Sequence, residues 1–324
     1  MSLIRVQNLH KHFSLSSGLG KNLVVKAVDG VSFELEKGEV LALVGESGCG
    51  KSTLALTLMH LEEASAGQVL FNDNDITTLK GKALKNLRRD IQMVFQDPYE
   101  SLNPLMTVGA IVEEPLKVHG LGKSKSARQE MVKKALEDAG LNPAESYLNR
   151  RPHELSGGQR QRVVIAAALV LEPSLVIADE PVSMLDVSIR AEVLGVLERL
   201  KLEHSVAMLF ITHDLGTAAH FADRIAVMYL GRIVELGETQ DVLENPQHPY
   251  TKALLSVIPV PNPKLRRKHI ILQGDPPNPI NIPGGCRFHP RCPVAIPTCS
   301  KQEVALKHIN INHKAACLLL DHSA

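Results

Sequence analysis

The sequence predicts an α/β fold built around a mainly parallel sheet. Short apolar strand patterns alternate with helical patterns over residues 1–258, and a glycine-rich turn directly follows one of the strands. Parallel strands need long crossover connections, which helices usually provide, so this alternation predicts helices on both faces of the sheet. After residue 258 a proline-rich stretch leads into a cysteine-rich one, which predicts a linker and a small, loop-rich module over residues 259–324.

The expected elements follow from local patterns along the chain. Short apolar runs between turn residues predict strands at 3–9, 31–44, 67–71, 175–178, 208–212, 225–228 and 233–235. Helical periodicity is found at 52–61, 156–171, 189–202 and 217–222. Residues 105–150 are mostly helical in pattern, and we expect breaks at Pro115, at 120–122 and at Asn142-Pro143.

The composition predicts a soluble, cytosolic protein. Lys+Arg total 36 against 35 for Asp+Glu, aromatic residues make up 3% and Trp is absent, which together argue against a nucleic-acid-binding surface. The longest apolar run, at 163–171, is too short to span a membrane, and the N-terminus lacks the pattern of a signal peptide. We therefore expect any membrane contact to be made only through partner proteins.

The glycine-rich turn carries the strongest chemical signal. The pattern G-x-x-x-x-G-K-[ST] is matched at every position by Gly45, Glu46, Ser47, Gly48, Cys49, Gly50, Lys51 and Ser52. The turn follows a strand and opens a helix, so its backbone N–H groups are expected to surround phosphate oxygens. Lys51 is expected to reach the β- and γ-phosphates and Ser52 to ligate Mg²⁺, whereas Cys49 is expected to be a small spacer.

Two carboxylates follow the strand predicted at 175–178. Beside a phosphate loop, Asp179 is expected to hold Mg²⁺, directly or through water, and Glu180 to polarise the attacking water as a general base. Without the phosphate loop, two acidic residues after a strand would indicate only a solvated loop.

A second anion site is predicted where the 156–171 helix begins. The segment reads Leu155, Ser156, Gly157, Gly158 and Gln159. Ser156 can cap the helix, and the glycines leave the backbone open to a ligand. Because one phosphate loop already serves one nucleotide, a second cradle predicts a site completed between two chains. The alternative is an ordinary helix cap.

The order of these three motifs resembles that of the ATP-binding subunits of ABC transporters, over about residues 3–258. The resemblance implies ATP and Mg²⁺ as cofactors and hydrolysis of ATP to ADP and phosphate. It also implies a P-loop NTPase core of the ABC ATPase type, with an antiparallel β layer from the N-terminal strands and a helical subdomain at about 97–155. The whole ATP-binding domain is then expected at 1–258.

The resemblance also assigns individual residues. It gives Gln96 a role in sensing Mg²⁺ and the attacking water, and His213 a position facing the γ-phosphate, so that both join Glu180 as catalytic residues. The nucleotide-binding residues further include Thr53, Asp186 in the D-loop at 183–186, and Phe13, which stands where the family places an aromatic ring against adenine.

Two positions depart from the family pattern. Met184 stands where the D-loop usually has Ala, and Ala167 where the helix after the second cradle usually has Arg. Both departures leave the predicted catalytic residues intact. We expect them to affect the rate of ATP hydrolysis at one of the two sites that form between two chains.

Four of the five cysteines lie close to the C-terminus: Cys286, Cys292, Cys299 and Cys317. In a reducing compartment such a group indicates a metal site more readily than disulfides. The intervals are wide for zinc and suit a 4Fe–4S cluster with a structural role; zinc, two disulfides and four free thiols are the alternatives. His289 is an alternative ligand, although the following Pro290 favours a loop role.

Segments 97–104 and 248–251, with the terminal cysteines, resemble the oligopeptide/dipeptide importer subfamily. That resemblance implies a 4Fe–4S cluster and a motor for di- or oligopeptide import; nickel and glycoside importers share many of these features. The implied partners are two membrane permease subunits, a paralogous ATPase subunit or a second copy, and indirectly a substrate-binding protein. The implied location is the cytoplasmic face of the cell membrane.

Two rival functions belong to other classes. A soluble ABC ATPase of DNA repair or translation usually has two such domains in one chain or a long coiled-coil insertion, and this sequence has neither. A regulatory module without ATPase activity is disfavoured because Lys51, Glu180 and His213 are all present.

Overall fold

The computed structural model describes residues 2–16, 22–258 and 269–322. The chain divides into two compact units, which are treated separately. The first unit comprises Met1–Leu3, Leu35–Val40 and Thr78–Ile211, and the second comprises Ile4–Glu34, Leu41–Thr77 and Thr212–Ala324. The linker predicted around Pro259 and the basic stretch 264–268 lie outside the described residues. Within the described ranges, no helix combines the length and the apolar character that crossing a bilayer requires.

Parallel strands form the centre of the first unit. β6 (Ile91–Val94) pairs with β7 (Leu175–Asp179), and β7 pairs with β8 (Ala207–Thr212). Every residue of β7 and β8 is buried. Continuous burial is expected of parallel strands that are covered on both faces.

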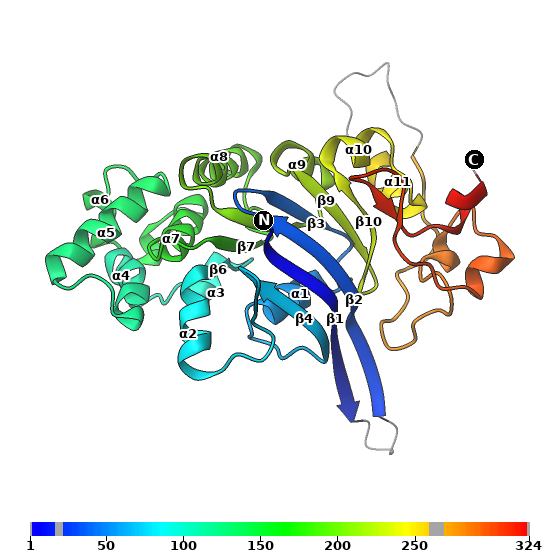
Figure 1. Cartoon of the computed structure of the whole chain (residues 1–324). Coiled ribbons are helices and arrows are strands. Elements are labelled where there is room, and N and C mark those ends of the chain that lie inside the picture. Colours follow the sequence, from blue (N-terminus) through cyan, green and yellow to red (C-terminus); the bar gives the residue numbers. More distant parts are fainter. Residues whose placement is uncertain (1, 17–21, 259–268, 323–324) are drawn as a thin grey trace. The chain divides into compact units, whose positions relative to one another are not determined.

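Helices surround these strands in the first unit (Figure 1). They are α2 (Gly81–Asp90), α3 (Pro98–Ser101), α4 (Val108–His119), α5 (Lys125–Asp138), α6 (Glu145–Leu148), α7 (Gly157–Leu169) and α8 (Val187–His204). α4, α5 and α7 pack against one another, and α4 also contacts α6. α3 to α6 fall within the range 97–155 that the sequence predicts to be helical.

The predicted break at Pro115 is wrong, because α4 continues through this residue to His119. Proline removes one backbone donor from the helix. Three residues of the same helix, Val108, Val112 and Leu116, are 0% exposed, and their packing compensates for the lost bond. The helix ends instead at Gly120, whose φ of 68° is typical of a helix C-terminus.

The second unit contains two sheets among its described residues. In the first sheet, β1 (Ser2–Ser16), β2 (Asn22–Glu36), β4 (Ala66–Phe71) and β5 (Asn74–Asp75) follow the order β2-β1-β4-β5. β4 is antiparallel to both β1 and β5. The N-terminal strands therefore do contribute an antiparallel layer, as predicted.

The other sheet of the second unit carries the phosphate loop. β3 (Val40–Val44) runs parallel to β9 (Arg224–Tyr229), and β10 (Arg232–Glu238), β12 (Lys314–Ala315) and β11 (Lys307–His308) extend it in antiparallel fashion. The α-helices of this unit are α1 (Lys51–Leu58), α9 (Leu215–Phe221), α10 (Thr239–Glu244) and α11 (Pro249–Ser256), visible in Figure 1.

A buried acid joins the C-terminal segment to this sheet. Glu235 of β10 is 0% exposed, and its carboxylate accepts the backbone N–H groups of Gln247 (2.7 Å) and His248 (2.9 Å). His313 Nε2, from the C-terminal segment, lies 2.7 Å from the same carboxylate. A buried carboxylate needs such partners, so the strand pairing of β12 with β10 is reinforced by a polar contact.

Three aromatic rings close the space between α11, β9 and the cysteine-rich segment. Tyr229, Tyr250 and Phe288 are each at most 1% exposed. The ring centroids lie 4.8 Å apart for Tyr229 and Tyr250, 5.3 Å for Tyr229 and Phe288, and 5.4 Å for Tyr250 and Phe288. Edge-to-face and tilted packing at these distances is favourable.

His248 makes the stability of this region sensitive to pH. Its Nδ1 accepts the backbone N–H of Tyr250 (3.1 Å) at the start of α11, and burial lowers the pKa of His248 to about 4. In the unfolded chain a histidine titrates near 6.5, so the unfolded state takes up the proton first as the pH falls. The stability that neutral His248 provides is therefore complete above about pH 6.5 and is lost on the way to pH 4.

His248→Asn should reduce this pH dependence, because asparagine keeps a capping oxygen and does not titrate. Between pH 6.5 and pH 4.5, we expect the wild-type free energy of unfolding to fall by about 2 kcal/mol more than that of the variant. Urea unfolding of both proteins across this range measures the difference. Parallel pH profiles would show that His248 does not carry the effect.

Candidate functional site

The phosphate loop has a backbone that only glycine permits at two positions. The loop connects the buried strand β3 to α1, and Gly50 has a φ of 108°. A Cβ on Gly50 would lie 2.0 Å from the carbonyl oxygen of Ala27, and a Cβ on Gly45 would lie 2.2 Å from that of Met228. The loop therefore packs directly on neighbouring backbone, and its conformation is fixed by that contact.

The start of α1 offers positive potential and polar side chains. Lys51 is 5% exposed, and its Nζ donates to the carbonyl oxygens of Gly45 (2.7 Å) and Glu46 (3.1 Å). Ser52 is exposed on the first helical turn, Thr53 is half-buried, and that turn contains no acidic residue. Free N–H groups, a lysine and a hydroxyl at one helix N-terminus make an anion site that could also ligate a cation through the hydroxyl.

Cys49 is a buried residue of the same loop. Burial raises the pKa of its thiol, although the nearby Lys51 charge opposes this. A neutral, buried thiol is a packing group rather than a nucleophile. This environment agrees with the spacer role expected for Cys49.

In the first unit, the structure brings two predicted catalytic residues together. Asp179 ends β7 and is 5% exposed. Glu180 follows with a φ of 47°, and its Oε2 accepts a hydrogen bond from Gln96 Nε2 (3.1 Å). The Glu180 N–H donates to the carbonyl of Ile211 (2.9 Å), and its own carbonyl accepts the Ser183 hydroxyl (3.0 Å). A non-glycine residue in the left-handed region is held by such bonds, often at functional sites.

The second predicted anion site begins α7. Ser156 is exposed and caps the helix: its hydroxyl accepts the N–H of Gln159 (3.3 Å), and the Gln159 side chain accepts the N–H of Ser156 (3.0 Å). A Cβ on Gly158 would lie 2.3 Å from Cγ2 of Ile189, so this glycine allows close packing against α8. The predicted cap is therefore confirmed, and the exposed helix start suits an anion.

Three further residues singled out from the sequence belong to the first unit. Asp186 is exposed at the N-terminus of α8. Met184 is 58% exposed, so its bulk relative to alanine needs no space in the core. Ala167 is half-buried within α7.

Phe13 and His213 belong to the second unit. Phe13 is only half-buried, and Lys11 Nζ lies 4.6 Å from its ring centroid, so the ring is not a core residue. His213 is exposed on the turn before α9. Asp214 holds that turn by accepting the N–H of Gly216 (2.9 Å) and the hydroxyl of Thr217 (2.7 Å).

The predicted site residues thus fall into two sets, one in each unit. The first unit holds Gln96, Asp179, Glu180, Asp186 and residues 155–159. The second unit holds Phe13, residues 45–53, His213 and the four C-terminal cysteines.

Sequence reasoning missed a cluster of His10, His12 and Asp29 in the second unit. His10 Nδ1 and His12 Nε2 each lie 3.0 Å from Asp29 Oδ1, and the potential ligand atoms are all within 4.8 Å of one another. The alternation of His10 and His12 along one strand was the available signal.

Asp29 is, however, already compensated by cations. Its Oδ2 pairs with Arg287 and, at 3.4 Å, with Arg232. Burial alone would raise the pKa of Asp29, but the Arg287 guanidinium and the two histidines hold it well below its usual range. Two guanidinium groups beside the carboxylate disfavour a bound cation, so the cluster is an ion-pair network.

The C-terminal cysteines are all free thiols. The backbone N–H of Cys286 donates to the carbonyl of Cys299 (2.8 Å). The preceding residue, Gly285, has a φ of 67°. Burial raises the pKa of Cys286 and Cys317 and raises that of Cys292 to about 11, with the neighbouring thiols adding to each shift.

These thiols suit a cationic group in number and chemistry. Thiolates in such surroundings need positive charge to be stable, which iron or zinc would provide. Among the described residues, no three of these sulfurs lie within 4.8 Å of one another. The sulfurs are therefore not gathered as the ligands of a single metal ion would be. His289 does not join them through Nδ1, which contacts the carbonyl of Cys286 (2.8 Å).

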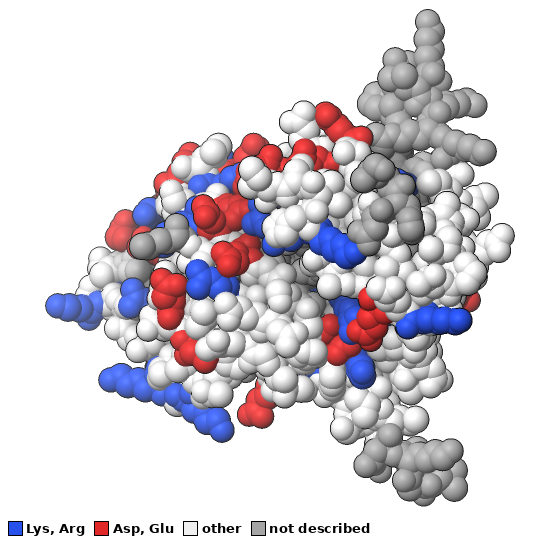
Figure 2. Space-filling view, turned by 45° about the vertical axis from the view of Figure 1, so that its right-hand side comes forward, with Lys and Arg blue, Asp and Glu red and all other residues white. Residues whose placement is uncertain are grey.

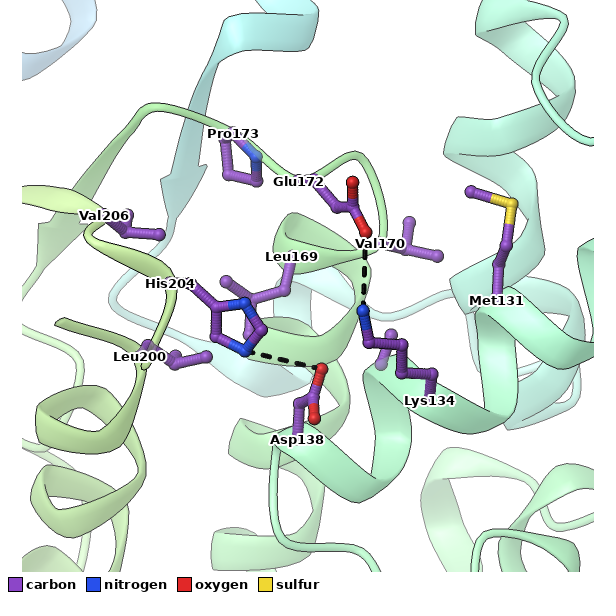
Figure 3. Close-up of a pocket in the computed structure, with 11 residues that line it drawn as sticks. Met131, Lys134, Asp138, Leu169, Val170, Glu172, Pro173, Leu200, His204 and Val206 are labelled. Atoms are coloured by element: carbon purple, nitrogen blue, oxygen red, sulfur yellow. Dashed lines mark ion pairs between the residues drawn. The ribbon is translucent and has the colours of Figure 1, made fainter. Parts of the chain in front are cut away.

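A cavity of about 280 Å³ in the first unit contains none of the predicted site residues (Figure 3). It is lined by apolar side chains such as Met131, and its charged groups pair with each other. Lys134 contacts Glu172 (3.5 Å), and His204 contacts Asp138 (3.8 Å). Self-paired charges leave little to recognise a ligand, so we assign the cavity no function.

Charged side chains are distributed rather than gathered on the face seen in Figure 2. Acidic and basic residues alternate there among uncharged surface. That face therefore carries mixed charge.

Family comparisons match most of the chain. The ABC transporter family matches residues 28–183, and the family described as "Oligopeptide/dipeptide transporter, C-terminal region" matches residues 234–299. The second match ends at Cys299 and includes Arg287 and Arg291.

Named relatives are similar over nearly the whole length. The oligopeptide transport ATP-binding protein AppF of Bacillus subtilis (strain 168) is 48% identical over 98% of this chain and 97% of its own. OppF of Salmonella typhimurium (strain LT2), an oligopeptide transport ATP-binding protein, is 46% identical over 98% of this chain and 96% of its own. A putative peptide import ATP-binding protein of Brucella ovis is 46% identical over 98% of this chain and 97% of its own.

Solved structures share the fold of the larger part of the chain. The ATP-binding cassette MJ0796, determined as a dimer in a post-hydrolysis state with ADP and Pi, has a TM-score of 0.64 at 30% identity and covers 73% of this chain and 98% of its own. The structure of cbiO1 from Clostridium perfringens, part of the transporter complex cbiONQ, has a TM-score of 0.64 at 28% identity, covering 75% and 91%.

Proposed function

Because this chain belongs to the family of ABC transporter ATP-binding subunits, we propose that it is the ATPase that drives a peptide importer. The observation that carries the ATPase assignment is the complete phosphate loop at 45–52, held in a conformation that only glycine permits at Gly45 and Gly50. The peptide cargo is supported by the match of residues 234–299 to the oligopeptide/dipeptide transporter C-terminal region and by the names of the relatives.

In the proposed reaction, the loop N–H groups and Lys51 bind the β- and γ-phosphates of ATP. Ser52, Asp179 and Gln96 would hold Mg²⁺, which would supply positive charge beside the phosphates. Glu180 accepts a proton as water attacks the γ-phosphorus, and the bond to the β-phosphate oxygen breaks to release ADP and phosphate. His213 donates to the γ-phosphate, Phe13 supports the adenine, and Thr53 and Asp186 complete the nucleotide contacts.

The hydrogen bond between Gln96 and Glu180 supports this assignment of roles. Gln96 Nε2 donates to Oε2 of the carboxylate (3.1 Å), which orients the Glu180 side chain. Of the two neighbouring acids Asp179 and Glu180, only Glu180 has its backbone in the left-handed region. This conformation is energetically unfavourable for a residue other than glycine.

We further propose that two ATP-binding chains act together. The N-terminus of α7, with the exposed Ser156 and the buried Gly158, would complete the phosphate-loop site of a partner chain. The dimeric structures of the similar cassette MJ0796 agree with such a pairing. The partner is a paralogous ATPase or a second copy of this chain.

The other proposed partners follow from the family. Two membrane permease subunits would convert closure of the ATPase pair into transport, and a substrate-binding protein would deliver the cargo. The chain would then sit at the cytoplasmic face of the membrane and touch it only through the permeases. Residues 1–258 form the proposed ATP-binding domain, with a helical subdomain at 97–155, and residues 259–324 form the linker and cysteine-rich module.

For the module we propose a 4Fe–4S cluster on Cys286, Cys292, Cys299 and Cys317. The group would cross-link a segment whose helices are single 3₁₀ turns, at His289–Arg291, Pro297–Ser300 and Leu318–His322. The proposal rests on the number of free thiols and on the wide sequence intervals between them.

Glu180→Gln tests the proposed reaction. Glutamine keeps the size and the hydrogen bond to Gln96 but cannot accept the proton, so turnover should fall at least about 100-fold while Mg-ATP still binds. Release of phosphate and equilibrium binding are measured on the same preparation. Glu192→Gln, which removes a 62% exposed carboxylate of the same unit, serves as the control. Turnover of Glu180→Gln within about threefold of wild type would contradict the general-base role.

Ser156→Arg tests the two-chain site. The substituted side chain would occupy the partner's γ-phosphate position, so ATP hydrolysis by the complex should fall at least about tenfold although the variant's own loop still binds ATP. Ser124→Arg changes an exposed capping serine of α5 and should leave hydrolysis at the wild-type rate. Equal rates for the two variants would argue that each chain hydrolyses ATP alone.

Serine substitutions at the four cysteines test the cluster. Each single change should remove iron, acid-labile sulfide and the brown absorption from anaerobically purified protein, because the cluster needs four thiolate ligands. Cys49→Ser is the matched control and should retain the wild-type iron content. Wild-type protein with one zinc and no iron per chain, or with no metal, would refute the cluster.

A further inference from the structure

We propose that the cysteine-rich segment is part of the nucleotide site, with Arg291 as the positioning residue that holds the phosphate loop through Glu46. This inference rests on the proposed binding of ATP phosphates at 45–52. It needs no particular group bound to the cysteines, since the contacts that carry it are made by the chain itself.

Arg291 forms a paired contact with the side chain of Glu46. Nη1 of Arg291 lies 2.7 Å from Oε2 of Glu46, and Nη2 lies 3.2 Å from Oε1. The Arg291 side chain is 8% exposed and that of Glu46 is 28% exposed. Two parallel hydrogen bonds between a guanidinium and a carboxylate fix orientation as well as distance, so Arg291 sets the position of the second residue of the loop.

The backbone of Glu46 is held from the same side. Its N–H donates to the hydroxyl of Tyr250 (2.9 Å), and Tyr250 is 0% exposed. The Tyr250 ring packs on Phe288, which precedes Arg291 by three residues and is 1% exposed. Both the side chain and the amide of Glu46 are thus positioned by groups that the segment 286–292 supports.

The far end of the loop has a related support. The carbonyl of Cys49 accepts the N–H of Gly231 (2.8 Å). The preceding carbonyl, of Leu230, accepts Nη1 of Arg287, whose Nη2 pairs with the buried Asp29. The turn that fixes Cys49 is therefore itself fixed by the cysteine-rich segment, and both ends of the loop depend on it.

Two physical effects make this support relevant to phosphate binding. Loop N–H groups bind an anion tightly only when they are already in place, because the entropy lost on ordering the loop would weaken binding. The Glu46 carboxylate also stands next to an anion site, and Arg291 neutralises it. Removing Arg291 would loosen the loop and leave an unpaired negative charge beside the phosphates.

The sequence places the cysteine-rich module after every group that hydrolysis needs and predicts a purely structural role for it. The contacts of this module with Glu46 and Leu230 revise that expectation. Arg287 and Arg291, which lie between Cys286 and Cys292 in the sequence, thus acquire a role in positioning the nucleotide loop.

Affinity for Mg-ATP in the full-length chain tests the inference. Arg291→Ala should raise the Kd and the KM for ATP about tenfold while kcat changes less than about twofold, because Glu180 and Gln96 are untouched. Arg291→Lys should recover part of the affinity by restoring the charge without the paired contact. The double variant Glu46→Gln with Arg291→Ala should bind ATP better than Arg291→Ala alone, because the unpaired carboxylate is gone.

Glu303→Gln is the matched control within the C-terminal segment. Glu303 is 70% exposed and pairs with Arg232, so this variant should bind ATP like the wild type. Wild-type affinity, within about twofold, in folded Arg291→Ala would overturn the inference and leave the ATPase assignment standing. Absence of ATP binding in the wild type would instead refute the proposed function.

Discussion

Close packing of the phosphate loop against neighbouring backbone is the constraint on which the nucleotide site depends. The missing side chains of Gly45 and Gly50 allow the loop to lie on the carbonyls of Met228 and Ala27, which belong to β9 and β2. The loop can then present its N–H groups and the first turn of α1 to an anion without further rearrangement. Since β9 leads directly into the turn before β10, the position of the loop is linked to the segments that pack on this turn.

Those segments come from the far end of the chain. Glu235, His313 and the pairing of β12 with β10 anchor the C-terminal segment to the sheet, and the rings of Tyr229, Tyr250 and Phe288 fill the space between them. The buried Glu235 carboxylate has three partners, which favours one arrangement over many. A region with little regular structure of its own is thereby held rigidly enough to support the loop.

Much of the fold and the local chemistry could be predicted from the sequence. The strands at β3, β7 and β8, the glycines of the loop and the Ser156 cap all reflect short-range patterns, which a sequence displays directly. The helix through Pro115 could not be foreseen, because packing of α4 outweighs a local preference. The contact of Arg291 with Glu46 spans 245 positions, and the network of His10, His12 and Asp29 joins separate strands, so only the folded chain reveals them.

Calorimetric titration of the full-length chain with Mg-ATP and with AMP tests most directly whether residues 45–52 bind the phosphates of ATP. Recognition by Lys51 and the loop N–H groups acts on the β- and γ-phosphates, which AMP lacks. ATP should therefore bind at least about 100-fold more tightly than AMP, a difference of about 2.7 kcal/mol. Equal affinity for the two nucleotides, or no binding of ATP, would contradict phosphate recognition by this loop.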